Sequence, residues 1–143
     1  CPCGNASSVG AQAGCLNSTA AAGKLTATGG ASLAVDTIVL SGTGMPNGPA
    51  LYFQGTTQLG GGAGIAFGDG LRCAGGSTIR LSIQTNVSGS SQFPIGAGPR
   101  LSVVGLVAAP GTRNYQVWYR DSAAFCTAST FNVTNGWKVV WAP

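Results

Sequence analysis

The chain has 143 residues, the size of one domain, and 44% of them are hydrophobic, which is enough for a core. Only 7% of the residues are charged, against roughly 25% in an ordinary soluble domain. The lysines and arginines give a net charge of +4 but stand singly along the chain, whereas a nucleic-acid-binding domain concentrates them on one stripe. No apolar run reaches the roughly 18 residues of a membrane span. We therefore expect neither a nucleic-acid partner nor a membrane span.

Five cysteines in a chain without histidine indicate disulfides rather than a zinc site. Disulfides place the protein outside the reducing cytosol, and we expect an extracellular, secreted protein at the cell surface. The chain begins with Cys1 and not with methionine. This start predicts a processed secreted chain or a fragment of a longer one.

Residues 1–23 show neither helical nor strand periodicity and predict an extended N-terminal arm, stapled by a disulfide. Cys1 and Cys3 flank Pro2 and would form a poor disulfide with each other, so either Cys3 or Cys1 is expected to pair with Cys15. Cys73 and Cys126 are expected to bridge strands or loops further on. The odd cysteine is assigned to Cys1, which is predicted to be unpaired, bonded to another chain or bonded to sequence upstream of the arm.

Residues 24–143 predict one β-sandwich domain. Gly, Thr, Ser and Val are common and strong helix formers are few, which favours strands and turns. Strands are predicted at residues 24–28, 33–41, 50–58, 71–73, 77–85, 101–107, 113–120 and 137–141. Turn formers separate them, including the glycine-rich residues 60–70, which lack the Gly-Lys-Ser/Thr ending of a phosphate-binding loop.

Several of these runs alternate between apolar and polar residues. Tyr115, Val117 and Tyr119 fall on one side of a strand. One face of the following run carries Trp137, Val139 and Trp141, and one face of residues 77–85 carries Ile79, Leu81 and Ile83. Turn signals every 8–12 residues and about eight to nine strands are typical of an all-β fold. We predict a single antiparallel β-sandwich, of jelly-roll or immunoglobulin-like type.

Catalytic chemistry has few candidate residues in this sequence. General acid–base catalysis at neutral pH mostly uses His, Glu or Asp, and only Asp36, Asp69 and Asp121 are present. Asp69 in the segment FGDG fits a turn better than a calcium site, because no D-x-D spacing accompanies it. Asp36 lies between apolar neighbours of a predicted strand and is expected to face solvent or pair with an arginine. We predict a protein that is not an enzyme, without cofactor or metal.

Surface contacts have a few candidates. Trp118 is out of phase with Tyr115 and Tyr119, and Tyr52 or Phe53 is a further exposed aromatic candidate. Trp118 and Tyr52 are taken as the candidate aromatic contact surface, while Trp137 and Trp141 are assigned to the core. N-x-S/T triplets make four asparagines candidate glycosylation sites: Asn5, Asn17, Asn86 and Asn132.

Low charge, a spare cysteine and an ordered arm favour an assembly protein. Natural β-proteins guard strand edges with charges, especially lysine, and this chain has two lysines. The leading prediction is therefore a structural subunit that self-assembles with copies of itself into an extracellular filament or surface layer, through its arm, strand addition and disulfides. The alternative is a carbohydrate-binding or adhesive module of a larger secreted protein, with glycans as partners.

The segments CPCGN, GCLNS, ALYFQG, FGDGLRCAGG, YQVWYRD and FNVTNG, spread over nearly the whole chain, resemble a family of secreted domains abundant in planctomycetes and similar environmental bacteria. Members of that family often stand at the C-terminal end of longer exported proteins. The resemblance implies secretion, a bacterial source and a partner for Cys1 upstream. It implies no activity.

Overall fold

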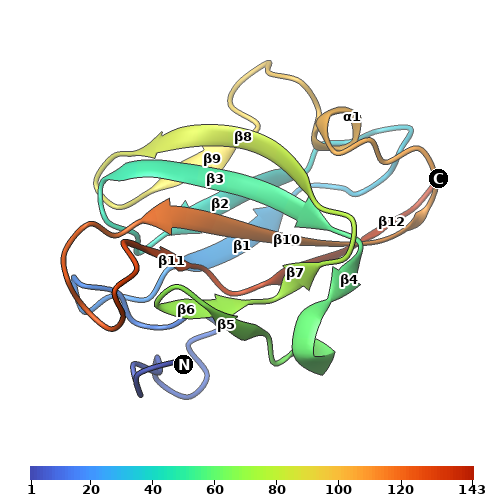
Figure 1. Cartoon of the computed structure of the whole chain (residues 1–143). Coiled ribbons are helices and arrows are strands. Elements are labelled where there is room, and N and C mark those ends of the chain that lie inside the picture. The colour runs from blue at the N-terminus through green and yellow to red at the C-terminus, as the bar shows by residue number, and fades with distance from the viewer.

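A computed structural model describes residues 1–143 and shows an all-β protein (Figure 1). The twelve strands are β1 (Lys24–Thr28), β2 (Val39–Thr43), β3 (Gly48–Gly55), β4 (Thr57–Gln58), β5 (Ile65–Phe67), β6 (Gly70–Arg72), β7 (Ala74–Gly75), β8 (Ile79–Asn86), β9 (Ser91–Phe93), β10 (Gly111–Arg120), β11 (Phe131–Val133) and β12 (Trp137–Trp141). Two short helices, η1 (Leu59–Gly62) and α1 (Leu101–Val104), complete the fold. Neither helix is long and apolar enough to cross a membrane.

Two antiparallel sheets form the predicted sandwich. The larger has the order β11-β10-β3-β8, with β12 beside β11 along the same edge of β10, and the smaller has the order β1-β2-β9. Their facing sides share one core, to which the small sheet contributes Leu25, Leu40 and Phe93. Two-stranded pairs, β4–β7 and β5–β6, lie outside this core beside the large sheet (Figure 1).

The alternation of β10 is confirmed, and it fills the centre of the core. Tyr115, Val117 and Tyr119 are fully buried, and Trp141 from β12 packs with them. The Trp141 Nε1–H donates to the Tyr115 hydroxyl (3.0 Å), which in turn donates to the Gln54 side chain (2.9 Å). Burial is the main cause that raises the pKa of Tyr115 to about 12, against the opposing effect of the bond from Trp141. The Gln54 Nε2 donates to the Gly105 carbonyl (2.9 Å), so the buried polar side-chain atoms of these three residues all have partners.

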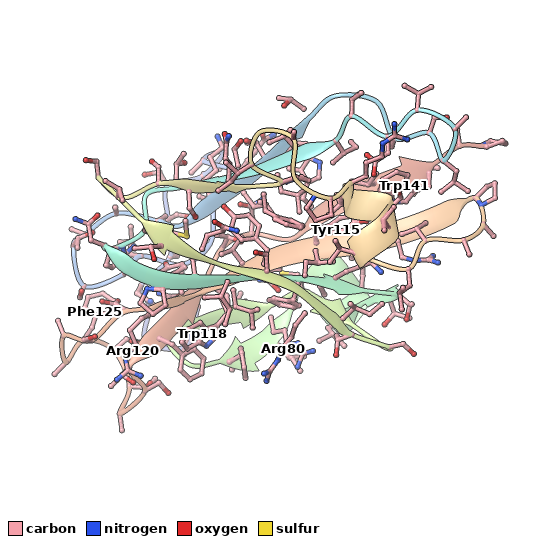
Figure 2. The ribbon with its side chains drawn as sticks, turned by 90° about the horizontal axis from the view of Figure 1, so that it is seen from above. Arg80, Tyr115, Trp118, Arg120, Phe125 and Trp141 are labelled. Carbon is pink, nitrogen blue, oxygen red and sulfur yellow. A yellow bond between two sulfur atoms is a disulfide. The ribbon has the colours of Figure 1, made fainter.

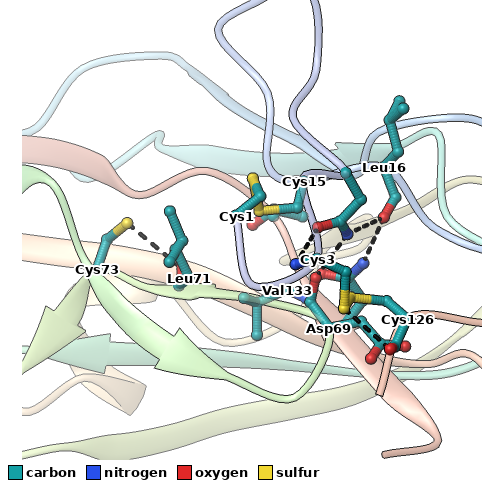
Figure 3. The surroundings of a disulfide bond; sticks show 12 residues. Cys1, Cys3, Cys15, Leu16, Asp69, Leu71, Cys73, Cys126 and Val133 are labelled. Atoms are coloured by element: carbon teal, nitrogen blue, oxygen red, sulfur yellow. Dashed lines mark hydrogen bonds between the residues drawn. A yellow bond between two sulfur atoms is a disulfide. The ribbon is translucent and has the colours of Figure 1, made fainter.

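The N-terminal arm lies on its own domain (Figure 3). Asn5 Nδ2 donates to the carbonyls of Leu16 (2.8 Å) and Asp69 (2.9 Å), and the Ser18 backbone N–H donates to Asp121 Oδ2 (2.9 Å). A Cβ on Gly14 would collide with the Val133 carbonyl of β11, so glycine is needed where the arm crosses that strand. Residues 1–23 are thus an integral layer of the fold.

Two strand predictions are wrong in an instructive way. Residues 101–107 begin with the helix α1, because the carboxylate of Asp36 accepts a hydrogen bond from the Ser102 backbone N–H (2.7 Å) and holds the helix start. The same carboxylate accepts from the Ile38 N–H (3.0 Å), so the chain bends at Asp36 and the strand starts only at Val39. Asp36 is buried, and does not face solvent or pair with an arginine.

Candidate functional site

A groove of about 540 Å³ lies on the outer face of the large sheet, on the side away from the core. This volume is within the range of roughly 300–1,000 Å³ that ligand sites occupy. Its floor is set by cross-strand register. Trp118 of β10 lies opposite Leu51 of β3, and Leu51 lies opposite Ile83 of β8. Arg80 and Trp118 point away from the interior that holds Tyr115 and Trp141 (Figure 2).

A β-bulge in β8 brings Arg80 to the groove. Leu51 pairs with Ile83 and Phe53 pairs with Arg80, so the register shifts between them and Leu81 is the extra residue. In a regular strand, residues three apart point to opposite faces, but the bulge turns both Arg80 and Ile83 outward. The predicted common face of Ile79, Leu81 and Ile83 is therefore wrong: Leu81 is in the core, whereas Ile83 is 70% exposed.

The β5–β6 hairpin forms one wall of the groove. The guanidinium carbon of Arg72 lies 5.6 Å from the centre of the Phe53 ring and 5.7 Å from that of Phe67, as cation–π contacts require. Phe67 packs on Phe131 (4.9 Å between ring centres), and Phe131 packs on Trp118 (5.6 Å). Aromatic rings therefore run from the hairpin to the floor of the groove, with a cation among them.

Gln116 holds this wall against β10. It is fully buried under β6 and β7, although strand alternation puts it on the outer face with Trp118. Its Oε1 accepts from the backbone N–H groups of Cys73 (2.8 Å) and Ala74 (3.3 Å). Its Nε2 donates to the carbonyls of Leu71 (2.8 Å) and Thr134 (2.6 Å). One side chain thus provides hydrogen-bond partners for three backbone groups of the segment that carries Arg72.

The exposed charged side chains are all cationic. Asp36, Asp69 and Asp121 are 6%, 0% and 1% exposed. Each accepts hydrogen bonds inside the fold, Asp69 from the N–H and hydroxyl of Thr127 and Asp121 from Ser18. No carboxylate lines the groove, which contains Arg72 and Arg80. The groove can therefore stack flat apolar faces on its aromatic rings and pair anionic or acceptor groups with its arginines.

The structure separates the two residues of the candidate aromatic surface. Trp118 lines the groove, as the alternation of β10 predicts. Tyr52 is fully buried in the core, where its hydroxyl accepts from the Gly42 N–H (3.2 Å) and bonds to Ser91 Oγ (3.0 Å). Burial raises the pKa of Tyr52. Its neighbour Phe53 faces the groove instead, because adjacent strand residues point to opposite faces.

The disulfides are Cys1–Cys15 and Cys3–Cys126, and Cys73 is the free cysteine (Figure 3). The prediction that Cys1 is the odd one and that Cys73 is bridged is therefore wrong. The Cys73 backbone is fixed by Gln116, and its side chain lies against Gly64 and Gly136, away from Cys126. Burial raises the pKa of the Cys73 thiol. Two disulfides indicate an oxidising, non-cytoplasmic environment.

The four asparagines of the N-x-S/T triplets are buried structural residues. Their Nδ2 groups donate to backbone carbonyls: Asn5 to Leu16 and Asp69, Asn17 to Gly44, Asn86 to Pro46 and Asn132 to Leu16. A glycan on Nδ2 would replace a donor and fill space that the core occupies. In the folded chain these four amides are therefore occupied by hydrogen bonds, and their glycosylation stays a prediction.

No protein-family model, curated protein or solved structure matches this chain. Sequence reasoning found Trp118 and left Phe53 as the alternative to Tyr52, but it missed Phe67, Arg72 and Arg80. The FGDGLR segment places two of these at either end of a tight hairpin, but its glycines give no sign that the hairpin lies over the sheet.

Proposed function

We propose that this domain is a non-catalytic glycan-binding module of a larger secreted protein, and that the groove on the large sheet is its binding surface. The observation that carries the proposal is the open row of aromatic rings, Phe67, Phe131 and Trp118, beside a groove on a sandwich face. Sugar rings have flat C–H faces that stack on aromatic side chains, and hydroxyls that need hydrogen-bond partners. The arginines and the exposed strand residues supply such partners.

The arrangement favours binding over catalysis. The three carboxylates are buried as hydrogen-bond acceptors of the fold, and no histidine exists in the sequence. The groove therefore offers neither the carboxylate pair of a glycosidase nor a general base beside a serine. A rigid sheet face with fixed rings is suited to holding a chain of sugars, because little ordering is needed on binding.

The binding proposal is tested by screening a glycan array with the wild-type domain, a Trp118→Ala variant and a Phe125→Ala variant. Phe125 is 42% exposed but does not line the groove, so it is the matched control. We expect binding to a defined set of glycans, loss of at least about tenfold in affinity for Trp118→Ala, and retention for Phe125→Ala. A folded wild-type domain that binds no glycan, or a Trp118→Ala variant that binds as tightly, would contradict the proposal.

Self-assembly into a filament is the second candidate. Its support is the strand β8, an eight-residue edge of the large sheet in which Arg80 is the one charged residue. The N-terminal arm does not support self-assembly, because two disulfides and several hydrogen bonds hold residues 1–23 on their own domain. Sedimentation over a wide concentration range tests it: oligomers that a Thr85→Lys change on β8 dissolves would favour assembly, and a monomer throughout would argue against it.

A further inference from the structure

We infer that the groove selects acidic polysaccharides, those whose sugar rings carry carboxylates, over neutral ones. This inference rests on the proposed glycan-binding function and names the class of glycan. It starts from the two groove arginines, which reach the site from different elements: Arg72 from the β5–β6 hairpin and Arg80 from the bulge of β8. Between them lies Phe53, whose ring contacts Arg72 and whose strand partner is Arg80.

The placement of Arg72 leaves its charge available to a ligand. Its Nε donates to the Ala74 carbonyl (2.9 Å), and its guanidinium lies by the rings of Phe53 and Phe67. These contacts fix the planar group without neutralising it, because a carbonyl and an aromatic ring carry no net charge. An arginine whose fork is already oriented loses less side-chain entropy when it binds a carboxylate bidentately.

The rest of the molecule provides no competing anion. The chain forms no salt bridge that would occupy either arginine, since all three aspartates are buried and each accepts hydrogen bonds from backbone or hydroxyl donors of the fold. Exposed cations without neighbouring anions create a positive potential over the surface, which raises the local concentration of anionic ligands. An acidic sugar would stack on Trp118 while its carboxylate reaches Arg80 or Arg72.

A nucleic acid is the rival polyanion, because its bases also stack on aromatic rings. The glycan is favoured on two observations. Outside the groove, Arg120 follows Trp118 by two residues on the same face of β10, but the other cations stand singly on β1, on β12, on the opposite face of β10 and before α1, so they form no phosphate-tracking stripe. Both disulfides also indicate an oxidising, non-cytoplasmic environment, away from the reducing cytosol and nucleus that hold a cell's nucleic acids.

The test uses a matched pair of ligands, an oligogalacturonate and the same oligosaccharide with its carboxylates methyl-esterified. Calorimetry compares the wild-type domain with Arg80→Gln, Arg80→Lys and Arg100→Gln. Arg100 is exposed like Arg80 but lies outside the groove. We expect the acid form to bind at least about tenfold more tightly than the ester and to weaken when salt rises from about 0.05 M to about 0.5 M. Arg80→Gln should lose about three- to tenfold in affinity, Arg80→Lys less, and Arg100→Gln under about twofold.

Each other outcome overturns the inference in a recognisable way. Equal binding of acid and ester would refute acidic selectivity while leaving the glycan-binding function intact. An equal loss of affinity in Arg80→Gln and Arg100→Gln would show that general charge attraction, and not the groove, holds the ligand. A single-stranded oligonucleotide that binds as tightly as the oligogalacturonate, with the same dependence on Arg80, would assign the groove to nucleic acid. Failure of both sugars together with an empty glycan array would remove the proposed function itself.

Discussion

The Arg72 guanidinium carbon lies 5.6 Å from the centre of the Phe53 ring, which joins the β5–β6 hairpin to the outer face of β3. This contact turns a sheet face into a walled groove. Cation–π contacts contribute about 0.5–1 kcal/mol where they are partly exposed, so this contact matters more for placing the guanidinium than for stability.

Arg72→Lys tests that role of the planar group. The variant keeps the charge but loses the flat fork that lies by Phe53 and Phe67. We expect affinity for the acidic glycan to fall about threefold to tenfold, with the free energy of unfolding lowered by no more than about 1 kcal/mol. Arg100→Lys is the control, because Arg100 is exposed and lies outside the groove. Unchanged affinity in Arg72→Lys would show that charge alone suffices.

Gln116→Met should both destabilise the domain and weaken binding. It removes an acceptor shared by two backbone N–H groups and two donated bonds, all in a buried site. Leaving such groups unpaired costs about 3 kcal/mol or more, and the loosened wall carries Arg72. The control is Gln84→Met, which loses one local bond to Ser82 (2.7 Å) and should cost at most about 1 kcal/mol. Urea unfolding measures the free energy of unfolding of both variants. Equal losses would contradict the role of Gln116 in holding the wall of the groove.

The two disulfides should differ in their effect on stability. Cys3–Cys126 spans 123 residues of sequence separation, whereas Cys1–Cys15 spans 14. If a disulfide acts mainly by restricting the unfolded chain, replacing the long-range pair by serines costs about 5 kcal/mol and replacing the short-range pair about 3 kcal/mol. Denaturant unfolding of the two double variants gives the values. A larger loss for the Cys1/Cys15 variant would mean that arm packing, and not loop closure, dominates.

Stability should fall at alkaline pH because of the core tyrosines. Burial is the main cause that raises the pKa of both Tyr115 and Tyr119 from 10.0 to about 12. Below pH 10 the phenols are protonated in both states. As pH rises from 10 to 12, the unfolded chain loses these protons first, so each tyrosine lowers the unfolding free energy by about 2 kcal/mol by pH 12. Unfolding at pH 9 and 11 in the wild type and a Tyr119→Phe variant checks this. A decline of the same size in the variant would contradict it.

The sequence predicted the sandwich well where local pattern and tertiary structure agree. The strand Lys24–Thr28 and the buried face of Tyr115, Val117 and Tyr119 follow from alternation and turn signals alone. Two of the misses share one cause, a contact with a residue distant in sequence. Asp36 fixes the start of α1, 66 residues away. Gln116 has the polarity of an exposed residue but is covered by β6 and β7.

The groove was the least predictable part, because register and not composition builds it. One extra residue in β8 decides whether Arg80 and Ile83 share a face, and an eight-residue strand carries no signal for that bulge. The free cysteine was equally hidden. Pairing depends on which loops the arm crosses, and the arm has no periodicity that would place Cys3 beside Cys126.

Chemical-shift mapping would show directly whether glycans bind in the groove. The isotopically labelled domain would be titrated with oligogalacturonate while its backbone amides and tryptophan indole signals are followed. We predict that the largest shifts fall on Trp118, Phe53, Arg72 and Arg80, and that Val35 and Leu106, exposed but outside the groove, stay still. Saturable shifts centred on Val35 and Leu106, with the groove signals unmoved, would contradict the account.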